Sequence, residues 1–198
     1  GAFGIVGRFS FLFLMVVMGF NQGMQPIAGY NYGARQYSRV RKVYLLTVAW
    51  ATAVCVLGFI ISEAFPVAAV RIFTNDETLL DLAAKGMRIM NFTFFLVGAQ
   101  MVSTNFFQCL GMVGKSIFLS LSPQLLFLVP CLYLLPLRFG VDGVWLSYPA
   151  SDVIAFTVTA FMVAALMRKF SKLADGDDPA EKEDRPGRSF FVRGTGRA

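Results

Sequence analysis

Long runs without a charged residue recur along the chain. Four of them cover residues 9–34, 43–62, 89–114 and 116–137, and a fifth, 143–167, contains a single acid, Asp152. A helix that crosses the hydrocarbon core of a membrane needs about 20 mostly apolar residues. Helices of soluble domains instead keep a polar face toward water. The pattern therefore predicts an all-α fold, a polytopic transmembrane helical bundle.

The runs divide the chain into a transmembrane part, 1–173, and a tail, 174–198. We expect five spans, and these cover about 9–33, 43–61, 87–110, 116–137 and 143–167. Asp76 and Glu77 follow Thr74 and Asn75, the pattern of an N-cap and an acidic first turn. A helix is therefore expected to begin there and to continue into the third span. The tail is charged, Gly-rich and without periodicity, which is typical of disorder.

Composition narrows the function classes. Hydrophobic residues make up 56% of the chain and charged residues only 15%. The net charge of +6 comes from bases in the tail and in short connections, a distribution that indicates membrane topology rather than nucleic-acid binding. The chain contains no His, and its sequence shows no catalytic motif, phosphate loop or metal-ligand cluster. We expect neither an enzyme nor a cofactor or metal site.

The bases also predict an orientation. Bases beside the spans are concentrated in the first connection, the third connection and the start of the tail: Arg35, Arg39, Arg41, Lys42, Lys115, Arg168, Lys169 and Lys172. The positive-inside rule places these segments in the cytoplasm. The first span then enters from outside without a signal peptide, so we expect an odd number of earlier spans in a longer protein. The expected location is a plasma membrane, the inner membrane of a bacterium.

Asp152 is the first candidate for a functional residue. An acid inside an apolar span costs at least ~2.5–3.5 kcal/mol at the bilayer centre, and such residues usually face a cavity or a partner. It is therefore a candidate proton or cation site, or an attractor for a cationic substrate. The alternative is a structural role, in which Asp152 bonds neighbouring backbone.

A polar stripe marks the third span. Four polar side chains recur there at spacings of seven, four and four, with Asn91 and Asn105 beside them: Thr93, Gln100, Thr104 and Gln108. Residues at these spacings share one helix face. We expect that face to line a cavity and to offer neutral hydrogen-bond partners. The alternative is hydrogen bonding between packed helices.

Prolines and amides mark the first and fourth spans. Asn21, Gln22 and Gln25 precede Pro26, which removes a backbone donor and bends a helix. Bent helices often form the binding sites of transporters. The amides are therefore candidates for the substrate or cation pathway, and we expect Pro26, Pro123 and Pro130 to act as hinges. The alternative for the first span is a packing interface made by Gly19, Gly23 and Gly29.

Four segments, in this order, are similar to one known family. They are QPIAGYNYGA at 25–34, LGMVGKS at 110–116, the proline-rich stretch 122–136, and GVDGVW at 140–145 followed by Pro149, Ser151 and Asp152. Together with their surroundings they cover about residues 19–166. The chain resembles the multidrug and toxic compound extrusion (MATE) family of secondary transporters.

The resemblance implies a fold and an activity. MATE transporters have twelve helices in two lobes around a central cavity, and the match corresponds to helices eight to twelve. The chain would then be one incomplete lobe, whose partner is the missing N-terminal lobe. The family exports drugs and other amphipathic organic cations across the membrane, by antiport with Na⁺ or H⁺. Membrane lipids would surround the lobe as a further partner.

The coupling ion and the function remain open in this sequence. Some family members carry a coupling Asp in helix ten, but the corresponding third span has no acid. The coupling ion is therefore open. Flippases for lipid-linked oligosaccharides share the architecture and are one alternative function. A non-transporting, truncated membrane fragment is the other.

Overall fold

The computed structural model describes residues 1–74 and 76–173, and the tail predicted to be disordered lies outside these residues. Every regular element in the described part is a helix. The elements are α1 (Ala2–Gly33), α2 (Tyr37–Ala64), α3 (Pro66–Arg71), α4 (Glu77–Asn91), α5 (Phe94–Cys109), α6 (Val113–Leu121), the π-helix η1 (Ser122–Leu128), α7 (Val129–Phe139) and α8 (Val141–Lys172).

Four helices among the described residues are long and apolar enough to cross a membrane. They are α1, α2, the continuous rod α6–η1–α7 and α8. The third expected span is divided between α4 and α5, and α5 alone has 16 residues. The helix that begins at Glu77 does not continue unbroken as expected, because a turn at Phe92 and Thr93 interrupts it. The chain is thus a multi-pass membrane protein with an all-helical fold.

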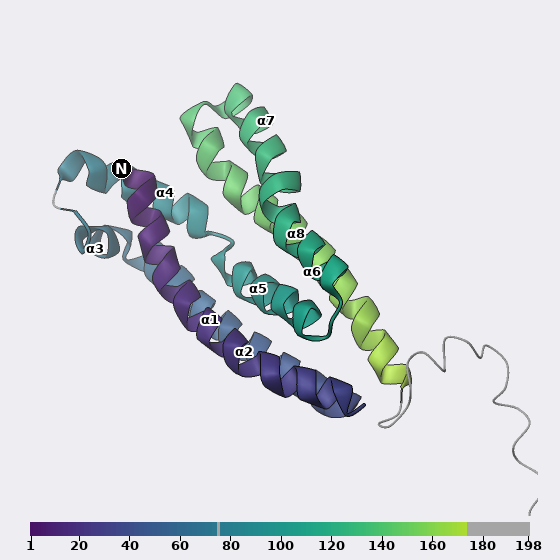
Figure 1. Ribbon diagram of the computed structural model, residues 1–198. Helices are drawn as coiled ribbons and strands as arrows, with labels where there is room; N and C mark the ends of the chain where they lie inside the picture. Colours follow the sequence, from purple (N-terminus) through teal and green to yellow (C-terminus); the bar gives the residue numbers. More distant parts are fainter. Residues whose placement is uncertain (75, 174–198) are drawn as a thin grey trace, which may run out of the picture.

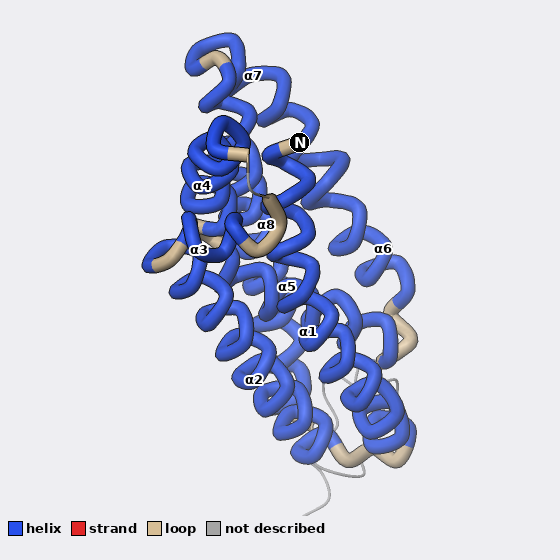
Figure 2. The backbone as a smooth tube through the Cα atoms, turned by 90° about the vertical axis from the view of Figure 1, so that its left-hand side faces the viewer, coloured by secondary structure: helices blue, strands red, loops and turns tan. Residues whose placement is uncertain are grey.

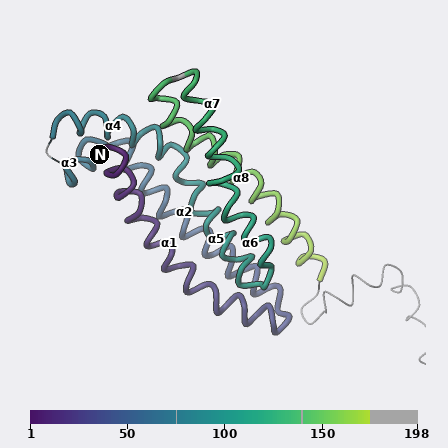
Figure 3. Tube along the Cα trace, turned by 45° about the horizontal axis from the view of Figure 1, so that its top comes forward, coloured from purple at the N-terminus to yellow at the C-terminus, as the bar shows by residue number. Residues whose placement is uncertain are grey.

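The helices form two groups with α5 between them. In Figures 1 and 3, α1 and α2 lie side by side, and α6, α7 and α8 form the other group. Helix α5 contacts α1, α2, α6 and α8. The arrangement places the polar stripe of α5 at the centre of the bundle.

Two apolar clusters hold the helices together. One joins α1, α2 and α5 through buried side chains that include Val17, Val40 and Phe106, and it extends to α6 and α8. Within it the rings of Tyr44 and Phe106 lie 4.5 Å apart, and the Tyr44 hydroxyl is 2.8 Å from Ser103 Oγ. The second cluster joins the start of α1 to α3, α4 and Trp145 of α8. Helix α5 is therefore fixed against α2, while its other side faces α6 and α8.

Short loops reverse the direction of the chain between consecutive long helices. Figure 2 shows short tan loops at the tip of α7 and at the lower end of the bundle, with others beside α3, α4 and α6. Gly111 and Gly140 have φ values of +76° and +58°, which residues with a Cβ rarely adopt, so each glycine permits a tight reversal. Gly140 joins α7 directly to α8, and these helices run side by side (Figure 1).

Candidate functional site

A cavity of about 790 Å³ lies where α5 faces α6, η1 and α8. Three members of the expected polar stripe, Gln100, Thr104 and Gln108, line it. Their spacing of four residues keeps them on one face of α5. The Thr104 hydroxyl donates to the backbone carbonyl of Gln100 at 3.0 Å, one turn earlier on α5. The structure thus brings most of the stripe together at one cavity.

Asp152 reaches the same cavity from α8. It is half-buried, and the hydroxyl of Thr93 at the start of α5 donates to its Oδ2 at 3.1 Å. This bond joins side chains of two helices, whereas the structural alternative placed its bonds on neighbouring backbone. Thr93 does not line the cavity itself but is connected to it through Asp152. Among the described residues that line the cavity, Asp152 is the charged one.

Asn91 is a cavity residue that sequence reasoning placed beside the stripe without making it a site candidate. It is 1% exposed, and its Oδ1 accepts a hydrogen bond of 2.9 Å from Ser10 Oγ on α1. Its Nδ2 has no hydrogen-bond partner among the described residues. A buried donor without a partner is costly. The position of Asn91 beside the polar stripe was the sequence feature that could have identified it as a cavity residue. The turn at Phe92 and Thr93 separates Asn91 from α5, and helical spacing alone does not predict this turn.

The amides of α1 divide into three situations. Gln25 Nε2 donates to Asn105 Oδ1 of α5 at 3.3 Å, and Asn105 lines the cavity. Asn21 is buried between helices, and neither atom of its amide has a partner among the described residues. Gln22 is exposed on the outer surface of α1. The structure therefore connects Gln25 to the cavity but not Asn21 or Gln22.

The predicted hinges occupy different places. Pro123 lines the cavity at the start of η1, and Pro130 lies in the first turn of α7. Pro26 lies inside α1, which continues to Gly33. Pro123 thus lies in the first turn of a π-helix and Pro130 just after its end, and π-helices often mark functional sites in helices.

The remaining cavity wall is apolar or neutral. Hydroxyls and an amide that the sequence did not mark come from three elements, α6, η1 and α8: Ser116, Ser120, Gln124, Tyr148 and Ser151. The hydroxyl hydrogen of Ser116 already has an acceptor within the protein, because it is donated to the Thr104 carbonyl at 3.1 Å. Met90, Phe94 and Met101 supply soft apolar and aromatic surface. One carboxylate, neutral polar groups and apolar surface together suit an amphipathic cation.

Comparisons with a family model and with curated proteins identify the same family. The sequence model of the MatE family matches residues 1–134. The multidrug export protein MepA of Staphylococcus haemolyticus is 22% identical over 160 residues, 79% of this chain and 34% of that protein. The chain thus spans about a third of the length of the curated relatives it matches.

Solved structures agree with the sequence match. The MATE multidrug transporter DinF-BH superposes with a TM-score of 0.75 and 40% identity, over 82% of this chain and 36% of that one. The outward-facing conformation of another multidrug resistance MATE transporter superposes with a TM-score of 0.80 at 19% identity, over 87% of this chain and 39% of that one. Members of the family are transporters rather than enzymes. The chain belongs to the MatE family of multidrug and toxic compound extrusion transporters.

Proposed function

We propose that this chain forms part of a cation-coupled antiporter that exports drugs and other amphipathic organic cations by alternating access. The cavity between α5, α6, η1 and α8 is the proposed pathway, and Asp152 is its proposed charge. The family match and the names of the relatives, multidrug export proteins, support the activity. The proposed location is a bacterial inner membrane, with the C-terminus in the cytoplasm.

Asp152 is the observation that carries this proposal. A carboxylate among apolar spans is rare and usually serves a pathway. It lies in a cavity wall that otherwise offers neutral groups, and Thr93 holds it toward α5. It can alternate between a proton or Na⁺ and a cationic substrate, which is the exchange that an antiporter requires. Gln100, Thr104 and Gln108 would bind varied substrates through neutral hydrogen bonds.

A second lobe is the proposed partner. The chain spans about a third of its relatives' length, and the family resemblance assigns it to helices eight to twelve. In such a transporter, two lobes rock about a central site. The π-helix that contains Pro123 and precedes Pro130 is the proposed flexible point of this lobe, and α1 at Pro26 is a second.

Substitution of Asp152 by Asn tests the proposal. The variant keeps the shape of the side chain and its bond with Thr93 but removes the charge. We expect efflux of a cationic dye from cells to fall on the order of tenfold or more, because a contact of ~1.4 kcal/mol already corresponds to a factor of ten. Membrane abundance must match the wild type.

Asp142→Asn is the matched control. Asp142 lies on the same helix but is exposed and pairs with Lys85 at 2.8 Å, away from the cavity. Its loss should leave efflux unchanged. Unaltered efflux by the Asp152 variant would refute the role of this carboxylate.

One observation bears on the flippase alternative. Lipid-linked oligosaccharides carry phosphate, which basic groups would bind. No Lys or Arg is among the described residues lining the cavity. The cavity of this lobe therefore favours cations. The third alternative is a non-transporting membrane fragment. It would be supported if the reconstituted, normally inserted chain transported neither organic cations nor lipid-linked oligosaccharides.

A further inference from the structure

A second groove lies at the end of the bundle that carries α3. It has a volume of about 620 Å³ and is formed by the end of α2, by α3 with the residue after it, and by α4. Its lining consists of Ala64, Phe65, Pro66, Val67, Ala68, Arg71, Ile72 and Arg88. We propose that this groove binds an anionic membrane phospholipid, with the phosphate between Arg71 and Arg88 and an acyl chain along the apolar wall.

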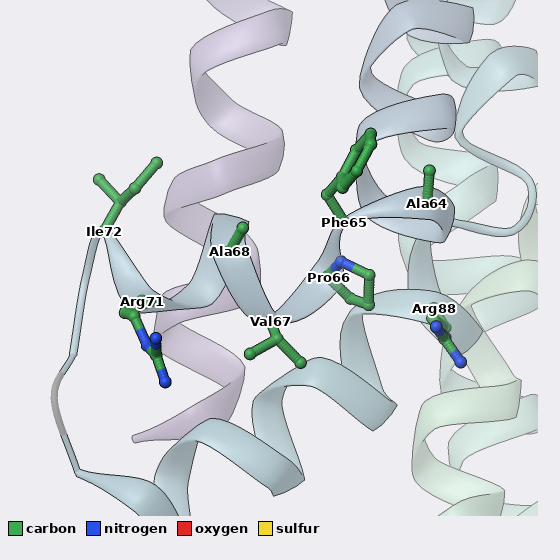
Figure 4. A pocket seen from close by; sticks show the side chains of 8 residues that line it. All are labelled: Ala64, Phe65, Pro66, Val67, Ala68, Arg71, Ile72 and Arg88. Atoms are coloured by element: carbon green, nitrogen blue, oxygen red, sulfur yellow. The ribbon is translucent and has the colours of Figure 1, made fainter.

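The two arginines come from different helices. Arg71 ends α3 and Arg88 lies in the last turn of α4. Figure 4 shows Pro66 and Val67 between them, so the arginines flank an apolar floor. Guanidinium groups bind phosphate oxygens through paired N–H donors, which makes Arg well suited to a phosphate headgroup.

Charge on the groove is of one sign. No acid is among its lining residues, and neither arginine forms an ion pair with a described residue. The ion pair of this end of the bundle, Lys85 with Asp142, involves neither arginine. Both guanidinium groups are exposed and available to an anion. Charge complementarity therefore favours an anionic ligand.

The position along the spans indicates the depth of the groove in the membrane. The charge-free run 43–62 ends just before Ala64, and the charge-free run 89–114 begins just after Arg88. Helix α2 is long and apolar enough to cross a membrane, and its last residue, Ala64, lines the groove. The end of this span therefore places the groove at the boundary between hydrocarbon and headgroups, where lipid phosphates lie.

The apolar wall distinguishes a lipid from a free anion. Phe65 is 64% exposed and Ile72 is 80% exposed, although both are large apolar side chains. Inorganic phosphate would leave this surface uncovered, whereas an acyl chain would cover it. Two arginines without an ion pair among the described residues, together with exposed apolar surface, thus fit one whole phospholipid.

Lipid selectivity of the purified full chain tests the proposal. Spin-labelled phosphatidylglycerol and spin-labelled phosphatidylcholine are each added in the same detergent micelles, and the motionally restricted fraction is measured by electron paramagnetic resonance. We expect a preference for phosphatidylglycerol that falls on the order of tenfold in Arg71→Gln/Arg88→Gln, because both bases that attract the anionic headgroup are lost. Arg71→Lys/Arg88→Lys should keep most of it.

Arg138→Gln is the matched control, because Arg138 is an exposed base near the end of α7 that does not line the groove. It should keep the full preference. An unchanged preference in the double Gln variant would overturn the proposal. An equal loss in the Arg138 variant would also overturn it, since selectivity would then reflect overall charge. Displacement of phosphatidylglycerol by millimolar inorganic phosphate would show a site for the free anion instead.

Discussion

At the scale of single residues, a glycine of α5 permits close packing against α2. A Cβ at Gly98 would lie 2.8 Å from Cys55 Sγ and 2.9 Å from the carbonyl oxygen of Ala51, both on α2. At Gly19 and Gly23 of α1 an added Cβ meets nothing within 4 Å. Small residues allow membrane helices to approach closely. Of the three α1 glycines for which sequence suggested packing, only Gly29 would bring a Cβ near another helix, 3.4 Å from the carbonyl oxygen of Cys109 on α5. The approach of α5 to α2 at Gly98 is closer.

Gly98→Val should destabilise the protein by about 1–3 kcal/mol, the usual cost of overpacking. The added methyl groups would meet backbone of α2, which cannot move aside as a flexible side chain can. The thermal unfolding midpoint in detergent measures the effect. Gly23→Val, in an equally helical but open position, should shift the midpoint much less. Equal shifts for both variants would contradict this account.

At the scale of elements, the N-terminus of α4 is capped by a side chain close to where the local sequence predicted a helix start. Asp76 is the N-cap, and its Oδ1 accepts from the Thr78 hydroxyl at 2.6 Å and from the Thr78 amide at 3.0 Å. The sequence predicted this boundary correctly, because capping involves only neighbouring residues. The hydroxyl bond, followed by bonds from the Thr78 and Leu79 amides, lowers the pKa of Asp76 below its ordinary value of 3.8.

A lowered pKa in the folded state makes the cap dependent on pH. The stabilisation is fully present above the unfolded value near 3.8 and is lost as pH falls through the lower folded value. We expect amide protection at Leu80, whose N–H donates to the Asp76 carbonyl, to decrease as pH falls below the unfolded value near 3.8, after correction for intrinsic exchange. Hydrogen exchange measures this. Asp76→Asn keeps a cap but does not titrate, so the same decrease in that variant would refute the explanation.

At the scale of the whole molecule, the two ends differ in charge. The α5–α6 turn beside Lys115 and the end of α8, with Lys169 and Lys172 in its last turn, lie at one end of the bundle (Figure 1). The N-terminus, α3 and the Gly140 turn lie at the other end. The bases that sequence assigned to one side are therefore gathered in space. This arrangement supports the proposed orientation, with the Lys115 end in the cytoplasm.

Labelling of single cysteines tests this orientation. In a variant without the native Cys55, Cys109 and Cys131, Lys115→Cys should react with a membrane-impermeant maleimide only in inverted vesicles, because the positive-inside rule places its end in the cytoplasm. Asp142→Cys should react only in right-side-out vesicles. Both sites are exposed, so both must react in detergent. The reverse pattern, or labelling of both from one side, would exclude the orientation.

Sequence by itself determined the membrane class, the helical fold and most of the stripe on α5. Length, hydropathy and helical spacing are properties of neighbouring residues, so Gln100, Thr104 and Gln108 could be assigned to one face without coordinates. Contacts between distant segments were decided only by the tertiary structure. The turn at Phe92 and Thr93, the bond from Thr93 to Asp152 across 59 positions, and the buried place of Asn91 depend on how α8 and α1 pack on α5. The same holds for the placement of Arg71 and Arg88 in the lining of one groove. No local pattern specifies which ends of different helices meet.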